Sequence, residues 1–309
     1  MFEFIKRTKR VRFSVLSDLW LTDISTRVKQ STLANYQTLL RKHLLPVFGS
    51  QYMRDITPGQ VADFLKSLGE QGLSVSTRRS IQFVVQMLFR FGEEAGCCEA
   101  MPFPALPTMP RGTVSTLTDE EFLKLESWLC EHLTPCNLGI LLCMYTGMRI
   151  GEVCAMRWGD VNLRAGTVTI GRTLQRVRGE GSSQILIDSP KSRSGVRCIP
   201  IPRQMMRMMK SRVGESETYL LTGTAEPMEP RHLQRKFKRC LALAEVRPVK
   251  FHTLRHTFAT RCMGVDLDPK TLSYILGHAN VSTTMTVYIH PSLEQIRRFM
   301  DRIPEVRTA

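Results

Sequence analysis

Apolar residues before residue 101 recur at intervals of three and four, the spacing of an amphipathic helix. Four segments share this spacing, with apolar positions at Leu16, Leu19 and Trp20; Leu33, Tyr36, Leu40 and Leu44; Val61, Phe64, Leu65 and Leu68; and Ile81, Val84, Leu88 and Phe91. Thr57 can cap the third segment, Pro58 suits its first position and Gln60 completes a capping box. The pattern predicts four short helices that form a domain over residues 13–100.

A proline-rich segment, residues 101–112, interrupts this pattern. It carries Pro102, Pro104, Pro107 and Pro110. These prolines exclude a regular helix and favour an extended connector. A chain of 309 residues also exceeds the size at which a single hydrophobic core stops growing. We therefore expect two domains joined by this linker, with the second over residues 113–291.

The pattern after the linker changes from helical to alternating and back. Thr118 and Glu121 form a capping box ahead of a helix, and an apolar helix follows through residues 138–145. Alternating or β-branched runs, separated by polar turns, then indicate a small antiparallel sheet at residues 166–173, 184–188 and 196–201. Helices resume over residues 231–244. The expected fold is mainly α, with an α+β second domain.

The charge balance indicates a polyanionic partner. The chain carries 43 Lys and Arg against 28 Asp and Glu, a formal net charge of +15, and basic residues are in excess on both sides of the linker. Nucleic acid is the first candidate and an anionic membrane the second. The longest apolar stretch, residues 138–145, is far shorter than the roughly 20 residues that a spanning helix needs. The amino-terminal residues lack the apolar segment of a secretory signal, so we expect a cytoplasmic protein.

The sequence carries no metal or nucleotide motif. Its nine cysteines are scattered without a CxxC spacing, which favours reduced and mostly buried thiols. HExxH, a P-loop and a cluster of acidic residues suited to two magnesium ions are also lacking. We expect chemistry that uses neither a metal nor a cofactor.

Four separated segments combine cationic or polar groups with an apolar setting. They are TGMRIGE at 146–152, PKSRSGVR at 190–197, HTLRHTF at 252–258 and LGHANVSTTMTVYIH at 276–290. In this order they resemble the tyrosine recombinase, or phage integrase, family, and the resemblance covers nearly the whole chain. It implies a SAM-like helical core-binding domain before the linker, a catalytic domain after it, and site-specific recombination of DNA.

The resemblance assigns the first catalytic arginine to Arg149 and its acidic support to Glu152. A surface Arg–Glu pair is the simpler interpretation of these two residues, since such pairs are common on helices. The hairpin lysine of the family falls on Lys191, with Arg193 as the rival if the register is shifted. A solvated basic turn would explain the same segment without any function.

The remaining site residues come from the last two segments. His252 and Arg255 lie three apart on an expected helix, which puts both on one face, whereas His256 is expected on another face. His278 follows Leu-Gly and precedes Tyr288, on which the family's nucleophile falls. Taken alone, such a histidine is usually a cap and such a tyrosine a core anchor.

The implied chemistry matches these residue types. Two guanidiniums, Arg149 and Arg255, suit the extra negative charge on a phosphodiester in its transition state. A phenol with an ordinary pKa of about 10 needs a base, for which His252 is the candidate, and the departing 5′ oxygen needs an acid, a role that resemblance gives to Lys191. His278 would hold the phosphate. The product is a 3′-phosphotyrosyl bond at Tyr288, which stores the ester's energy without ATP.

Further basic residues are candidates for DNA contact. The expected helix at 231–244 has a charged face, and other cations lie in the first domain. The candidates are Arg231, Arg235, Lys236, Arg239, Arg41, Lys42, Arg78 and Arg79. Solvated basic faces are the alternative. Residues 1–12 form a basic arm that either contacts phosphates or frays.

The carboxyl-terminal segment, residues 292–309, has an apolar stripe at Leu293, Ile296 and Phe299. The resemblance implies that this tail docks on a neighbouring subunit of a synaptic tetramer on DNA; packing on its own domain is the alternative. We expect a mobile-element integrase, or else a resolvase of chromosome dimers. A type IB topoisomerase and a DNA-binding regulator without catalysis are the other two functions considered.

Overall fold

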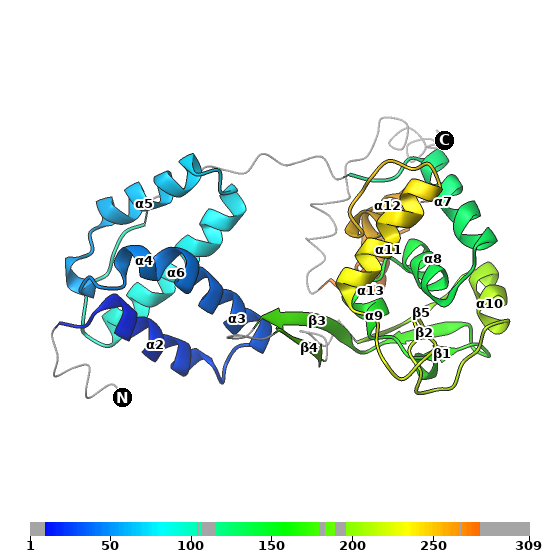
Figure 1. Ribbon diagram of the computed structural model, residues 1–309, viewed down its shortest axis with the longest axis horizontal. Coiled ribbons are helices and arrows are strands. Elements are labelled where there is room, and N and C mark those ends of the chain that lie inside the picture. Colours follow the sequence, from blue (N-terminus) through cyan, green and yellow to red (C-terminus); the bar gives the residue numbers. More distant parts are fainter. Residues whose placement is uncertain are drawn as a thin grey trace, which may run out of the picture. The chain divides into compact units, whose positions relative to one another are not determined.

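The computed structural model describes residues 10–103, 105–106, 115–178, 183–188, 196–265 and 267–278. These residues form two compact units, each with a hydrophobic core of its own (Figure 1). Lys191, Arg193, Tyr288 and the tail at 292–309 lie outside the described residues. The expected fold class, mainly helical with small antiparallel strands, is confirmed.

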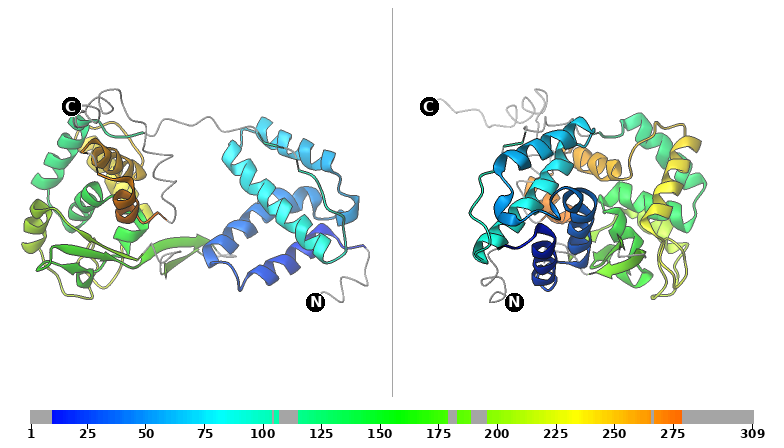
Figure 2. Two further views of the ribbon diagram at one scale, coloured as in Figure 1. Left: turned by 180° about the vertical axis from the view of Figure 1, so that it is seen from behind. Right: turned by 60° about the vertical axis from the view of Figure 1, so that its left-hand side comes forward.

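The first unit is mainly helical over its described residues, as its hydrophobic pattern predicts. Its elements are α2 (Phe13–Ile24), α3 (Gln30–Leu39), a π-helix (Leu40–Leu44), α4 (Leu45–Phe48), a 3-10 turn (Met53–Asp55), α5 (Pro58–Glu70) and α6 (Val75–Glu94). The predicted capping box of α5 is confirmed, because the backbone N–H of Thr57 donates to Oε1 of Gln60 at 2.8 Å and the N–H of Gln60 donates to Oγ1 of Thr57 at 3.3 Å. The long α6 packs across α2 and α3 (Figure 2).

The second predicted helix differs from a regular one. The backbone N–H of Leu45 donates to the carbonyl of Leu40, five residues back, so α3 passes through a π-helical turn into α4. Pro46 explains the change, because proline has no N–H and its ring clashes with the carbonyl four residues before it. A wider turn relieves that clash. Periodicity alone does not reveal such a turn.

Residues at both edges of the first unit pack onto its core. Val11 is buried and its carbonyl accepts a 2.9 Å hydrogen bond from the N–H of Met53, while Arg12 forms a β-bridge with Tyr52. The described end of the segment expected to be a basic arm is therefore part of the folded unit. Phe103, in the proline-rich segment, lies against Phe89.

The second unit surrounds one buried helix, α8, with further helices and short strands. Its helices are α7 (Asp119–Glu131), α8 (Pro135–Thr146), α9 (Ile150–Cys154), α10 (Arg203–Lys210), α11 (Pro230–Leu243), α12 (His252–Gly264) and α13 (Pro269–Leu276), and a 3-10 turn (Trp158–Asp160) precedes the strands. The capping box of Thr118 and Glu121 is confirmed at the start of α7. α8 is apolar on nearly all sides and contacts α7, α9, α10 and α12 (Figure 1).

The strands form two small sheets rather than one. β1 (Val161–Asn162), β2 (Thr167–Ile170) and β5 (Arg197–Pro200) make an antiparallel sheet, and β3 (Thr173–Arg178) pairs with β4 (Ser183–Asp188). The single run expected at residues 166–173 is thus divided between β2 and the start of β3. Ile170 pairs with Arg197 in the register of β2 and β5, and this register places the Arg197 side chain on the buried face with Ile199.

Most cysteines are enclosed, as expected, and among the nine only Cys198 is exposed. Within the described parts of the chain, no helix combines the length and the apolar character that crossing a membrane requires.

Candidate active site

Arg149 lies at the turn between α8 and α9. α8 ends at Thr146, and Gly147 reverses the chain with a φ of +63°, a backbone conformation that suits glycine. Arg149 directly precedes α9: its N–H donates to Oε2 of Glu152 and its Nη1 to Oε1, both at 2.9 Å. In the pair expected from TGMRIGE, the Glu152 carboxylate therefore accepts from both the backbone and the side chain of Arg149 and fixes the direction of the guanidinium.

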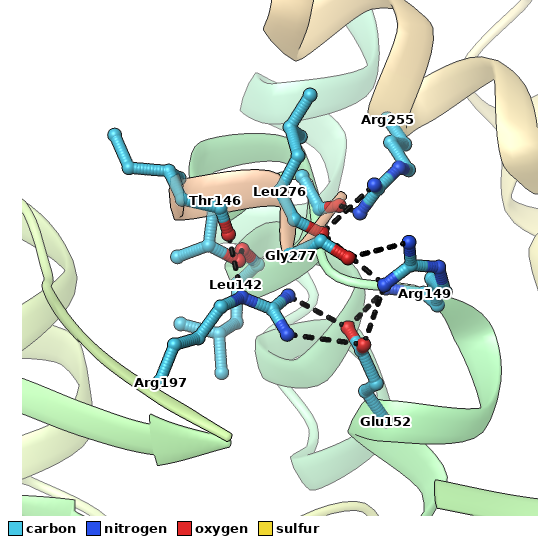
Figure 3. A network of polar contacts seen from close by, with 10 residues as sticks. Leu142, Thr146, Arg149, Glu152, Arg197, Arg255, Leu276 and Gly277 are labelled. Atoms are coloured by element: carbon cyan, nitrogen blue, oxygen red, sulfur yellow. Dashed lines mark hydrogen bonds and ion pairs between the residues drawn. The ribbon is translucent and has the colours of Figure 1, made fainter. Parts of the chain in front are cut away.

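Arg149 and Arg255 converge on the same carbonyl. Nη2 of Arg255, on α12, donates to the Leu276 carbonyl at 2.8 Å, and Nη1 of Arg149 donates to that carbonyl at 3.1 Å (Figure 3). Arg255 also donates to Gly147 at 2.8 Å, and Arg149 to Gly277 at 3.1 Å. Residues more than a hundred positions apart thus bring two guanidiniums side by side. The Arg149 side chain is 39% exposed, whereas Arg255 is buried.

The carboxyl end of α13 holds these cations. Asp268 caps the start of the helix, and Gly277 ends it with a φ of +65°. The last carbonyls of a helix have no partner within it and carry partial negative charge. In α13 the carbonyls of Ile275, Leu276 and Gly277 accept from arginine side chains instead. The helix end therefore acts as a fixed anionic partner for the cluster.

A third arginine, Arg197, completes the cluster and was not predicted from the sequence. Its side chain is fully buried and grips both oxygens of Glu152, with Nη2–Oε2 at 2.9 Å and Nη1–Oε1 at 3.1 Å. Burial tends to raise the pKa of Glu152, but the hydrogen bonds and charges of Arg197 and Arg149 lower it below its usual value. Alternation along VRCIPI was the available signal, since it puts Arg197 on the same face as Ile199 and Ile201.

Two histidines lie within electrostatic reach of the arginines. Partial desolvation lowers the pKa of His252, at the start of α12, to about 4, with further lowering by the charges of His256, Arg255 and Arg149. Desolvation and the nearby arginines also lower the pKa of His278 to about 4. Both imidazoles are therefore neutral at pH 7 and able to accept a proton or a hydrogen bond.

The expectation for His256 was wrong. Its ring lies 4.5 Å from that of His252, edge to face, because four residues make about one helical turn and bring both to one side of α12. Its pKa is also lowered, mainly by desolvation. His256 is therefore a direct neighbour of the candidate base.

Three predicted site residues, Lys191, Arg193 and Tyr288, lie outside the described residues. A different tyrosine, Tyr274 on α13, is described close to the cluster. It is 55% exposed, and its hydroxyl donates to the carbonyl of Cys198 at 3.4 Å. Tyr274 is thus the rival that any assignment of the nucleophile to Tyr288 has to exclude.

The basic helix expected at 231–244 is α11, and its cations divide between two faces. Arg231, Arg235 and Lys238 line a hollow of about 600 Å³ together with Arg176 of β3. Arg176 is held there by Glu229, at 2.8 Å. The predicted Lys236 and Arg239 are exposed but do not line this hollow. Burial raises the pKa of Cys136 and of Cys240, and the nearby charges of Lys236 and Arg239 oppose that rise.

The candidate DNA-binding cations of the first unit differ in their exposure to solvent. Arg41 and Lys42 are exposed on the π-helix, and Arg79 is exposed near the start of α6. Arg78 is half-buried, and its guanidinium lies so close to Gly69 that a Cβ there would be 2.6 Å from Nη1. Arg78 therefore packs within the first unit, whereas the other three face solvent.

The described cluster can bind and polarise a phosphodiester. It offers the guanidiniums of Arg149 and Arg255 in fixed positions and neutral imidazoles at His252 and His278. Fixed donors of this kind stabilise charge that develops on phosphate oxygens. Over the described ranges, no group of three or more His, Cys, Asp or Glu side chains could hold a metal ion.

Comparison with known proteins matches both units to one family. The model of the Phage integrase family matches residues 116–295, which includes every residue of the cluster. The model of the phage integrase N-terminal SAM-like domain matches residues 12–69 in the first unit.

Individual relatives have low sequence identity to this chain but match most of its length. A XerC-like tyrosine recombinase of Caldanaerobacter subterraneus is 25% identical over 75% of this chain and 66% of its own length. The ICEBs1 integrase of Bacillus subtilis is 21% identical over 98% of this chain and 86% of its own. The fold matches a solved structure of the Tn1549 transposon integrase in complex with transposon right end DNA, with a TM-score of 0.77, 22% identity, and coverage of 93% of this chain and 98% of that one.

Proposed function

Because the chain belongs to the phage integrase family of tyrosine recombinases, we propose that it cuts and rejoins two specific DNA sites through a covalent link to Tyr288. One observation supports this more than any other: Arg149 and Arg255 meet at the Leu276 carbonyl, next to two neutral histidines. Such convergence is unnecessary for DNA binding alone but suits a phosphodiester that gains charge during reaction.

The arginines bind the scissile phosphate in the proposed mechanism. Arg149, with its partly exposed side chain, and the deeper Arg255 hold the non-bridging oxygens as charge accumulates on them. His278, directly after the turn at Gly277, donates a hydrogen bond to the same phosphate. The two hydrogen bonds that Arg149 donates to Glu152 keep the guanidinium in place before DNA arrives, so little reorganisation is needed at the moment of reaction.

Proton transfers complete the cycle. The Tyr288 phenol loses its proton to His252 and attacks phosphorus, the bond to the 5′ oxygen breaks, and Lys191 gives that oxygen a proton. The product is a 3′-phosphotyrosyl bond and a free 5′ hydroxyl. Attack of another 5′ hydroxyl reverses these steps and releases Tyr288. A phosphate near His252 raises its low pKa by opposing the arginine charges, which makes it a stronger base once DNA is bound.

We assign the parts of the chain on the same basis. Residues 13–100 form a core-binding domain, 101–112 a linker and 113–291 the catalytic domain, with a basic arm before them and a subunit-docking tail at 292–309. Double-stranded DNA is the partner, and a tetramer brings two sites together in the cytoplasm. The net charge of +15 supports the choice of a polyanionic partner.

Integration or excision of a mobile element is the biological role that we favour. The ICEBs1 and Tn1549 integrases match more than nine-tenths of this chain, and the names of both refer to mobile elements. Resolution of chromosome dimers is the alternative and involves the same chemistry. DNA sites recovered from covalent complexes distinguish the two roles by their position in an element or at a chromosomal site.

Covalent trapping tests the proposal. A nicked suicide duplex loses the short strand next to the break, so the 3′-phosphotyrosyl adduct cannot be reversed and accumulates as a slowly migrating band on a denaturing gel. We expect the adduct with the wild-type chain and none with Tyr288→Phe. Tyr274→Phe is the matched control and should form the adduct.

The same assay separates the other candidate functions. A DNA-binding regulator gives no adduct with any duplex, which would refute the proposal. A type IB topoisomerase gives the adduct but also relaxes supercoiled DNA that carries a single site. Recombination between two sites on one plasmid, lost when one site is removed, supports the recombinase.

A further inference from the structure

Arg197 is the most enclosed cation of the cluster, and the mechanism above does not use it. Its side chain has no exposed area, whereas the neighbouring Arg149 is 39% exposed. Burying a guanidinium costs free energy unless its charge and its N–H groups are satisfied. Arg197 is therefore too deeply enclosed to contact DNA. Its buried charge must be balanced by hydrogen-bonding partners within the protein.

Those partners connect Arg197 to Arg149. The forked guanidinium of Arg197 holds Oε1 and Oε2 of Glu152, at 3.1 and 2.9 Å. The same two oxygens accept from Nη1 and from the backbone N–H of Arg149. Glu152 thus lies between two arginines, the fully buried Arg197 and the partly exposed Arg149 (Figure 3). Any rotation of the carboxylate would move both.

A second connection leads to the end of α13. Nε of Arg197 donates to the Ile275 carbonyl at 2.6 Å, and the next two carbonyls accept from Arg149 and Arg255. Gly277 makes this approach possible, because a Cβ there would lie 2.8 Å from Nη1 of Arg197. Arg197 therefore binds the same two groups that fix Arg149, which are the Glu152 carboxylate and the carboxyl end of α13.

We propose that Arg197 is a positioning residue for the Arg149 guanidinium, acting through Glu152 and the carboxyl end of α13. This inference rests on the proposed function of the cluster. Arg197 does not touch the phosphate; it limits Arg149 to the orientation that the transition state requires. Lysine cannot replace it, because an ammonium is a point charge without the planar fork that grips two oxygens.

The test compares two substrates that differ in charge at the scissile phosphate. One suicide duplex carries the natural phosphodiester, and the other carries a methylphosphonate, in which a methyl group replaces one charged non-bridging oxygen. The methylphosphonate gives an arginine less charge to stabilise, so a defect that acts through Arg149 shrinks on it. A general loss of folded structure lowers the cleavage rate equally on both.

We expect Arg197→Lys to lower the single-turnover cleavage rate on the phosphodiester about 10- to 100-fold, the usual effect of removing a group that orients a site residue. The Kd for the duplex should not change. Most of the loss should disappear on the methylphosphonate. The double variant Arg149→Ala/Arg197→Lys should cleave the phosphodiester no more slowly than Arg149→Ala alone, because both changes remove the same contribution.

Arg172→Lys is the matched control. Arg172 pairs with Asp160 through Nη2 at 2.6 Å, in the same unit but outside the cluster, and should keep the wild-type rate on both substrates. Glu152→Gln is a second variant in case Arg197→Lys does not fold: it keeps the shape of the carboxylate, removes its charge and should show the same dependence on substrate.

Three outcomes overturn the inference: a wild-type rate in Arg197→Lys, equal losses on both substrates, or losses that multiply in the double variant. A wild-type chain that forms no adduct on the phosphodiester instead contradicts the proposed function. The two failures are therefore distinguishable in one set of reactions.

Discussion

The arginine cluster and the basic face of α11 are both cationic, yet their surroundings differ. In the cluster, Arg149, Arg197 and Arg255 are fixed by hydrogen bonds to Glu152 and to the end of α13. On α11, Arg231 and Arg235 are exposed to solvent beside an open hollow.

Solvent screens the charges of an exposed face, so each contributes a modest and salt-dependent attraction to DNA. Cations held in a desolvated site interact more strongly with charge that develops nearby, and they need no rearrangement when it appears. Position in the fold, rather than charge alone, therefore separates residues suited to chemistry from residues suited to DNA affinity. Substitutions in the two regions should therefore have different kinds of effect.

The largest expected effect is on stability. Glu152→Ala removes the only carboxylate that Arg197 is shown to pair with among the described contacts, and leaves a buried cation. Breaking a buried pair from one side lowers the free energy of unfolding by about 3–5 kcal/mol. Glu217→Ala breaks the exposed pair with Arg157 and should change it by less than about 1 kcal/mol. Urea denaturation of both variants measures the difference; equal values would remove the distinction between buried and exposed cations.

The next effect is on the rate of chemistry. Arg149→Lys keeps the charge but cannot bind Glu152, Leu276 and Gly277 at once, so single-turnover cleavage should fall about 10²- to 10³-fold, the usual effect of losing one preorganised donor. The same substitution at Arg235, on the exposed face, should leave the rate at saturating DNA unchanged. Similar losses of cleavage rate in Arg149→Lys and Arg235→Lys would show that the cluster has no special role in the chemical step.

A smaller effect concerns affinity and salt. Arg235→Ala should weaken DNA binding at every sequence, and the slope of log affinity against log salt should decrease by about 1. Lys236→Ala is the adjacent control, because Lys236 does not line the hollow with Arg176 and Arg231. Fluorescence anisotropy over a range of salt concentrations checks both variants. Equal changes would show that the two faces of α11 contact DNA alike.

The last effect depends on pH. His252 and His278 have pKa values of about 4 in the folded chain, against 6.5 for an ordinary histidine. Between these values the unfolded chain binds more protons, so the free energy of unfolding falls as the pH is lowered from 6.5 towards 4. The double variant His252→Asn/His278→Asn should lose less stability over this range. Parallel curves for the two proteins would contradict the lowered pKa values.

The sequence predicted those parts of the fold that depend on local pattern. Amphipathic spacing and capping residues such as Thr57 and Thr118 located the helices, because each signal lies within a few residues of the element that it controls. The π-helical turn before Pro46 was not predicted, since a proline in a helical pattern can also end or kink the helix. The division of residues 166–173 between two sheets depends on pairing with β5, which is not local.

The candidate site was predictable where a family resemblance fixed the order of its segments. That resemblance pointed to Arg149, Glu152 and Arg255, which the fold brings together. Arg197 was missed because its role depends on the distant residues Glu152 and Ile275, and its segment looked like a solvated basic turn. Likewise, the sequence could not show which cations of α11 line the hollow with Arg176, because Arg176 comes from a distant strand.

The nucleophile is the central claim, and mass spectrometry of the trapped adduct tests it most directly. Tryptic digestion yields the peptide 271–297, which contains both Tyr274 and Tyr288. Fragmentation after nuclease treatment locates the residual nucleotide on one of them. We expect the added mass on Tyr288 and an unmodified Tyr274; a nucleotide on Tyr274, or on any other residue, would refute the assignment of the nucleophile.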